Sequence, residues 1–127
     1  MPLFFTKKEV FKWLVQGQKT VDVRKGNPLF GEFAVFQSGP QSLKFRIVKR
    51  ESGKLEDILR LDNFKIVIPS AANLGDAIDY LHGIYGVYDG VFTAYYVELV
   101  KFFFNCEKYV LFSVLCFLWF IIIRFSY

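Results

Sequence analysis

The chain has 127 residues, of which 54% are hydrophobic and 22% are charged, and its formal net charge is +4 at pH 7. This length fits a single domain, and the abundance of apolar residues excludes a largely disordered chain. The mild excess of lysine and arginine suits an anionic partner, either a nucleic acid or lipid headgroups, without selecting between the two.

The first predicted element is a helix that begins near Thr6 and ends at about Gln16. Thr6 and Glu9 have the spacing of a capping box, in which two side chains bond to backbone N–H groups at the helix start. Its buried stripe consists of apolar residues at helical spacing, namely Val10, Phe11 and Leu14. Gly17 follows, and glycine readily adopts the positive φ that ends a helix.

A strand over residues 19–24 comes directly after this glycine. In it, polar residues alternate with two valines, which is the two-residue period of a strand with one buried face. We expect the valines to enter the core and Asp22 and Arg24 to lie side by side on the open face. Lys19 stands at the start of the strand, within reach of both, so the three ionisable groups form a candidate site.

The remaining elements follow from hydrophobic period and from turn residues. They are strands over 33–37, 43–50, 65–68 and 91–99, a short helix over 54–61, a helix that opens at Asn73, and a glycine-rich loop over 83–90. Short strands interleaved with three helices predict an α+β fold. We expect a small barrel or strongly bent mixed sheet, with the helices packed on its outside.

Lys44 and Arg46 share the outward face of the strand over 43–50. The ordinary interpretation is a solvated strand face. The other is a basic strip that guides a nucleic-acid backbone, with Tyr95 or Tyr96 as a stacking surface. Adjacent residues of a strand point to opposite faces, so at most one of these tyrosines can serve.

No pattern in the chain indicates a metal or a cofactor. The two cysteines, Cys106 and Cys116, form no CxxC pair, and no cluster of carboxylates has metal-ligand spacing. His82 is the single histidine, and no nucleophile motif such as GxSxG accompanies it, so we interpret it as a cation near a helix end. Because no secretory signal opens the sequence, we expect a cytoplasmic location.

Residues 100–127 form a hydrophobic C-terminal tail that we separate from a domain over 1–99. The run Tyr109 to Ile123 carries no charge and is flanked by Lys108 and Arg124. As a helix it would rise about 22 Å, short of the roughly 30 Å of a hydrocarbon core, although snorkelling cations can narrow that gap. The alternatives are an anchor on the cytoplasmic face of a membrane, an apolar segment packed against the domain or another subunit, and a non-native extension.

The spacing Gly17-x-Lys19-x-x-Asp22-x-Arg24 resembles the GxKxxExR signature of the ASCH domain, a family of the PUA-like superfamily. Later segments follow in the order that the family uses, so the resemblance covers roughly residues 3–99. It implies a PUA-like barrel with a cleft between barrel and helices, and binding or processing of RNA. In one group of the family, which hydrolyses N4-acetylcytidine, a threonine stands at the position of Asp22. Because this chain has Asp22 in place of that threonine, the resemblance does not favour hydrolysis of N4-acetylcytidine here.

Three functions remain in view. In the first, an RNA-binding module, Lys19 and Arg24 contact phosphate, Asp22 accepts from a base amino group, and Lys44 with Arg46 extends the basic footprint. Against it stands a plain surface ion pair between Asp22 and Arg24.

The second is an RNA-directed hydrolase, either a ribonuclease or a modified-nucleoside amidohydrolase, with Lys19 as base or electrostatic stabiliser. A lysine serves as base when burial or a nearby cation lowers its pKa, and Asp22 would act in the opposite direction. The third is a membrane-attached interaction domain whose main feature is the tail.

Overall fold

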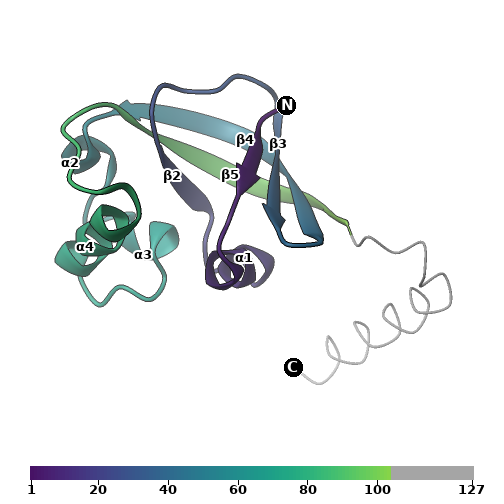
Figure 1. The fold of residues 1–127 in the computed structure, drawn as a ribbon, viewed down its shortest axis with the longest axis horizontal. Helices are drawn as coiled ribbons and strands as arrows, with labels where there is room; N and C mark the ends of the chain where they lie inside the picture. The colour runs from purple at the N-terminus through teal and green to yellow at the C-terminus, as the bar shows by residue number, and fades with distance from the viewer. Residues whose placement is uncertain (104–127) are drawn as a thin grey trace, which may run out of the picture.

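Five strands of residues 1–103, the part of the chain that the computed structural model describes, form one mixed sheet in the order β1-β3-β4-β5-β2 (Figure 1). Their bounds are Leu3–Phe5 for β1, Val21–Lys25 for β2, Phe33–Ser38 for β3, Gln41–Gly53 for β4 and Phe92–Phe103 for β5. β1 and β3 are parallel, and the other neighbouring pairs are antiparallel. The sheet is bent into a half-barrel, so its edge strands β1 and β2 approach each other across an opening.

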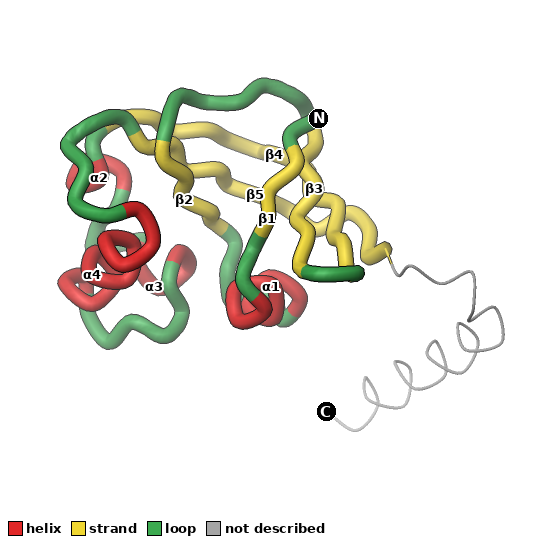
Figure 2. Tube along the Cα trace, in the orientation of Figure 1, coloured by secondary structure: helices red, strands yellow, loops and turns green. Residues whose placement is uncertain are grey.

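The described residues also form four helices, and Figure 2 shows three of them gathered at one end, with α1 apart beneath β1. The bounds are Lys8–Val15 for α1, Leu55–Ile58 for α2, Phe64–Val67 for α3 and Leu74–Tyr85 for α4. Asn73 caps α4, since its side chain accepts a hydrogen bond from the backbone N–H of Asp76 at 2.9 Å. The predicted helix from Asn73 is therefore confirmed together with its start.

Aromatic rings fill the concave side of the half-barrel. Phe4 of β1 lies 5.3 Å from Phe36 and 5.0 Å from Tyr95, centroid to centroid, and Phe36 meets Phe45 edge-on at 5.1 Å. All four rings are buried. Such tilted and edge-on pairs are the favoured aromatic geometry, so the core is held by rings from four strands.

One predicted strand is wrong, one strand is absent from the prediction, and one loop boundary is shifted. Residues 65–68 form no strand, because Phe64 and Ile68 take part in helical i→i−4 hydrogen bonds that make α3. β1 has no counterpart among the predicted strands, since its three residues are too few for a visible period. The loop over 83–90 also begins late, because α4 continues through Tyr85 and ends at Gly86, whose φ is +74°.

The predicted capping box at the first helix does not form. Lys7 is the N-cap of α1 and makes no side-chain capping bond. The hydroxyl of Thr6 instead donates to the carbonyl oxygen of Gln37 at 3.4 Å. Thr6 lies beside Gln37 because the parallel pairing of β1 with β3 places Phe5 opposite Gln37. The buried stripe of this helix is confirmed, with Trp13 added to it.

No helix within residues 1–103 is long and apolar enough to cross a membrane. The predicted apolar run Tyr109 to Ile123 lies outside the described residues, so the anchor and the division of the chain at residue 99 both stay predictions. The α+β half-barrel with helices outside it agrees with the predicted fold class.

Candidate functional site

The turn after α1 sets the position of the predicted site. Gly17 has φ +76°, and its N–H bonds to the carbonyl of Leu14, while the N–H of Gln18 bonds to the carbonyl of Trp13. These two bonds together are a Schellman motif, which closes the C-terminus of a helix and turns the chain away. The predicted role of Gly17 is confirmed, and the turn delivers Lys19 to the entrance of β2.

Lys19 is buried, with 3% of its side chain exposed. Its Nζ donates to the carbonyl oxygen of Val67, and the N–H of Thr20 bonds to the carbonyl of Ile66 at 3.1 Å. The end of α3 therefore fixes both the side chain and the backbone at the start of β2. This hydrogen bond from the ammonium group to a backbone carbonyl fixes the orientation of the lysine side chain.

Asp22 and Arg24 lie side by side, as predicted, but not on an open face. The Asp22 side chain is 6% exposed and the Arg24 side chain 23% exposed. Arg24 Nε donates to Asp22 Oδ2 at 2.6 Å, and Lys19 Nζ lies 3.8 Å from Oδ1 of the same carboxylate. The face is covered because the opposite edge strand and α4 close over it, which a strand pattern read alone does not reveal.

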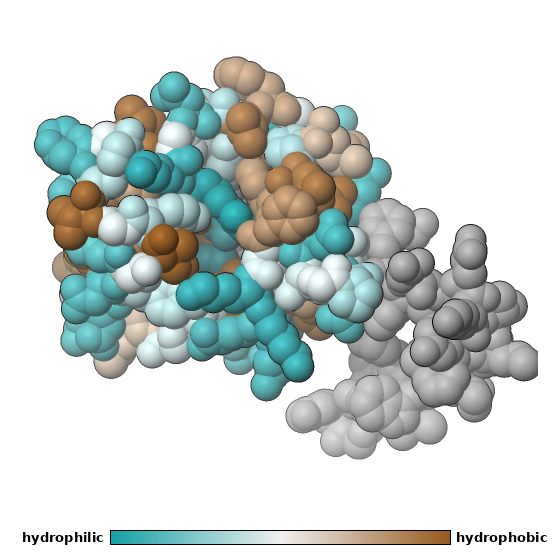
Figure 3. All heavy atoms as spheres, in the orientation of Figure 1, coloured by the Kyte–Doolittle hydropathy of each residue, from teal (hydrophilic) through white to brown (hydrophobic). Residues whose placement is uncertain are grey.

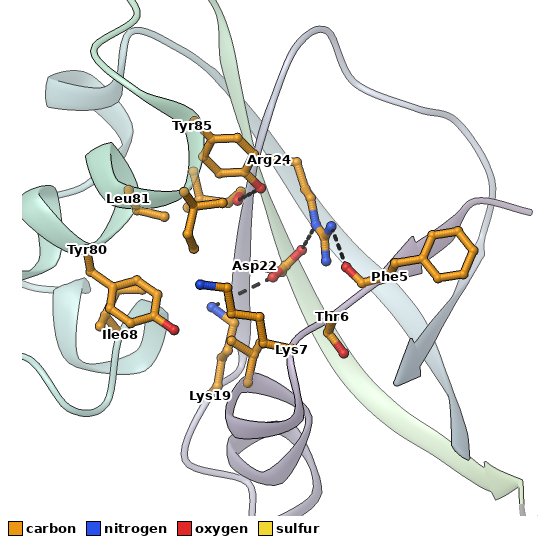
Figure 4. Close-up of a pocket in the computed structure, with 13 residues that line it drawn as sticks. Phe5, Thr6, Lys7, Lys19, Asp22, Arg24, Ile68, Tyr80, Leu81 and Tyr85 are labelled. Carbon is orange, nitrogen blue, oxygen red and sulfur yellow. Dashed lines mark hydrogen bonds and ion pairs between the residues drawn. The ribbon is translucent and has the colours of Figure 1, made fainter. Parts of the chain in front are cut away.

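The three motif residues line a pocket of about 80 Å³ at the opening of the half-barrel (Figure 4). One wall comes from the end of β1 and the start of α1, the floor from β2, and the far wall from α4. Its lining residues are Phe5, Thr6, Lys7, Val10, Lys19, Asp22, Val23, Arg24, Ile68, Tyr80, Leu81, Ile84 and Tyr85. The pocket thus combines three cations, one carboxylate and two phenolic rings.

Burial dominates the electrostatics of Lys19. Removal from water lowers the pKa of its ammonium from 10.5 to about 8, with a further lowering from nearby Arg24. The negative charge of Asp22 raises the pKa but does not offset the burial. Lys19 therefore loses its proton more readily than an exposed lysine, as the hydrolase hypothesis requires.

The pocket mouth includes residues that the sequence did not indicate. Lys7 is exposed, and its Nζ lies 5.9 Å from the centroid of the Tyr80 ring, so it reaches across the mouth (Figure 4). Tyr85 donates from its hydroxyl to the carbonyl of Val23 at 3.3 Å, which ties α4 to β2. Lys7 lines the pocket and the adjacent Lys8 does not, because of the direction that the chain takes between β1 and α1. The sequence alone does not indicate which of the two lysines faces the pocket.

The other predicted contacts lie away from the pocket. Lys44 and Arg46 do not line it; they stand over the ring of Phe33, at 4.4 Å and 5.6 Å from its centroid. Tyr95 is 1% exposed, and its hydroxyl accepts from the N–H of Leu29 at 2.9 Å, so it is a core residue and not a stacking surface. Its neighbour Tyr96 is half-buried.

Within residues 1–103, no three histidine, cysteine or acidic side chains are grouped to hold a metal ion. His82 lies on α4, half-buried, and its carbonyl accepts the N–H of Gly86. The polar side-chain groups that line the pocket are ammonium, guanidinium, carboxylate, phenol and hydroxyl groups.

No family model matches the sequence, and no curated protein matches it. Solved structures with a similar fold include the following two. The hypothetical protein PH0355 superposes with a TM-score of 0.63 at 14% identity, covering 77% of this chain and 97% of its own. An ASCH structure from Zymomonas mobilis superposes with a TM-score of 0.58 at 16% identity, covering 84% of this chain and 73% of its own. The predicted ASCH resemblance and the PUA-like fold class are confirmed as statements about the fold.

Proposed function

We propose that this chain, whose fold is ASCH-like, is a module that binds single-stranded RNA through the pocket of the half-barrel. The observation that supports this proposal is the meeting of Lys19, Asp22 and Arg24 in one pocket, with Lys7 at its mouth. Polyanions are attracted by such grouped cations, and single strands can place an unstacked base where a duplex cannot enter.

The groups in the pocket complement the edge of a nucleobase. Lys19 has three N–H donors, of which the Val67 carbonyl takes one. Asp22 Oδ2 is bonded to Arg24, whereas Oδ1 lies 3.8 Å from Lys19 Nζ, beyond hydrogen-bond distance. An exocyclic amino group can therefore donate to Oδ1 while a ring acceptor receives a hydrogen bond from Lys19.

Lys7 supplies the phosphate contact in this proposal. Arg24, in contrast to the prediction, is occupied by Asp22 and by the carbonyl of Phe5 at 3.0 Å. Its charge still contributes to the field of the pocket, but an exposed ammonium at the mouth reaches a phosphate without breaking existing bonds. A pocket of about 80 Å³ admits part of one nucleotide, so the rest of the strand lies outside it.

The test is a titration of the full chain into fluorescein-labelled single-stranded RNA at several salt concentrations, followed by anisotropy. We expect affinity to fall steeply with salt, and Lys7→Ala to reduce the salt slope by about one. Lys8→Ala is the matched control, because Lys8 is also exposed but does not line the pocket. Affinity that is independent of salt, or equal effects of the two substitutions, would contradict the proposal.

The lowered pKa of Lys19 supports a second candidate, an RNA-directed hydrolase in which its neutral amine removes a proton from the attacking group. The test is cleavage of end-labelled RNA by the full chain across the pH range around 8. This candidate predicts a rate that rises with pH through about 8 and vanishes in Lys19→Met. If the wild-type chain binds RNA without cleaving it, the hydrolase candidate is rejected and the RNA-binding function is retained.

A further inference from the structure

The outer face of β1 carries exposed apolar side chains beside the pocket. Leu3 is 49% exposed and Phe5 is 68% exposed, while Phe4 between them points into the core. In Figure 3, apolar atoms gather over β1 on the same side of the molecule that opens the pocket. The backbone of Phe5 accepts the bond from Arg24, and its ring points away from the pocket (Figure 4).

Strand register connects this face to the predicted basic strip. Leu3 is paired with Val35, and Val35 is paired with Lys44. Phe33, two residues before Val35 on the same face, is paired with Arg46. Directly paired residues share a face of the sheet, so the outward side chains of β1, β3 and β4 form one surface about 10 Å across.

This surface has the composition of a single-strand binding platform. Lys44 and Arg46 both stand over the Phe33 ring, and the carboxylate of Glu32 lies 4.0 Å from the Arg46 guanidinium, which offsets part of its charge. Aromatic rings interleaved with cations bind single strands, because bases stack on the rings while the cations follow the phosphates. We name the set of Phe5, Leu3, Val35, Phe33, Lys44 and Arg46 the sheet-face path.

We propose that the RNA strand leaves the pocket across the ring of Phe5 and continues over the sheet-face path to Lys44 and Arg46. This inference rests on the proposed function and adds the route of the strand outside the pocket. It joins two groups of residues that the sequence presents as separate. The continuity with the pocket and the positive charge at the far end favour RNA over an uncharged partner.

The experiment compares binding of fluorescein-labelled oligouridylates of about three and about nine nucleotides to the full chain. We expect Phe5→Ala and Lys44→Ala each to weaken binding of the longer oligonucleotide about fivefold to tenfold. Lys44→Ala, at a residue that does not line the pocket, should leave binding of the shorter one nearly unchanged. Phe5→Trp, which keeps a stacking ring, should retain the wild-type affinity. Phe30→Ala is the control, because Phe30 is 82% exposed but lies on the loop between β2 and β3.

The outcomes separate this inference from the function it rests on. If Phe5→Ala and Lys44→Ala bind both lengths like the wild type while Lys7→Ala weakens both, the pocket binds RNA and the sheet-face path is rejected. If the wild-type chain binds neither oligonucleotide, both proposals fall. If Phe5→Ala instead changes the mass of the particle in sedimentation and not the affinity for RNA, the face is a contact between copies of the chain.

Discussion

Arg24 of β2 donates a hydrogen bond from Nη1 to the carbonyl oxygen of Phe5 in β1 at 3.0 Å. These two strands are the opposite edges of the sheet, so this side chain spans the opening of the half-barrel. The same guanidinium lies 4.8 Å from the Phe4 ring and holds the Asp22 carboxylate. The arginine that the sequence suggests as a phosphate ligand is therefore also a structural bridge.

Replacement of this bridge should destabilise the fold. In Arg24→Ala the buried Asp22 carboxylate loses its closest partner, and we expect the free energy of unfolding to fall by about 2 to 3 kcal/mol. Arg46→Ala is the control, since its ion pair with Glu32 is exposed and 4.0 Å long, and it should change stability by less than about 0.5 kcal/mol. Urea denaturation measures both. Equal unfolding free energies of the two variants would show that the contacts of Arg24 with Asp22 and Phe5 do not stabilise the fold.

Strong local patterns predicted much of this fold. The alternation around Phe45 and Ile47 marked β4, and the cap and stripe from Asn73 marked α4. Residues 65–68 resemble a strand in sequence because three of them are β-branched, and these residues carry no information about the helical turn that their neighbours impose. β1 was missed because its pairing with β3 is supplied by a distant segment.

The meeting of three charged residues was predicted from the sequence, but their burial was not, and the predicted Lys44 and Arg46 lie outside the pocket. Lys19, Asp22 and Arg24 do meet, since one turn and one strand place all three. Their burial comes from α4 and from the end of β1, which are remote in sequence. Lys7 enters the pocket for the same reason, and no spacing within the motif indicates it.

The helix-ending turn offers a test in which two glycines respond with opposite signs. Gly17 has φ +76°, so Gly17→Ala should lower the free energy of unfolding by about 1 kcal/mol. Gly83 lies inside α4 with open space where an added Cβ would stand, so Gly83→Ala should raise the free energy of unfolding by up to about 1 kcal/mol. Thermal or urea denaturation of both variants is sufficient. A stabilising Gly17→Ala would contradict the Schellman turn at this position.

Lys19 makes a prediction for alkaline pH. Its pKa in the folded chain is about 8, below the ordinary 10.5, so between these values the unfolded chain binds more protons and stability rises with pH. Below about pH 8 both states are protonated and the cost of burying the charge is fully present. The stability of the wild type relative to Lys19→Met should therefore rise by roughly 2 kcal/mol from pH 8 to 10.5.

Other alkaline groups are common to both proteins in this comparison, so the difference in unfolding free energy isolates Lys19. Urea denaturation at a series of pH values provides it. A difference that stays constant across this range would show that Lys19 keeps an ordinary pKa, and the hydrolase candidate would lose its support.

The central claim, that RNA enters the pocket between β1, β2 and α4, is tested most directly by amide chemical shifts of the isotope-labelled full chain during titration with single-stranded oligouridylate. The account predicts that the amides of Thr6, Lys19, Asp22 and Tyr85 shift together, while those of α2, which does not line the pocket, stay in place. Shifts that leave these four amides unchanged, or that are confined to α2 and its surroundings, would contradict it.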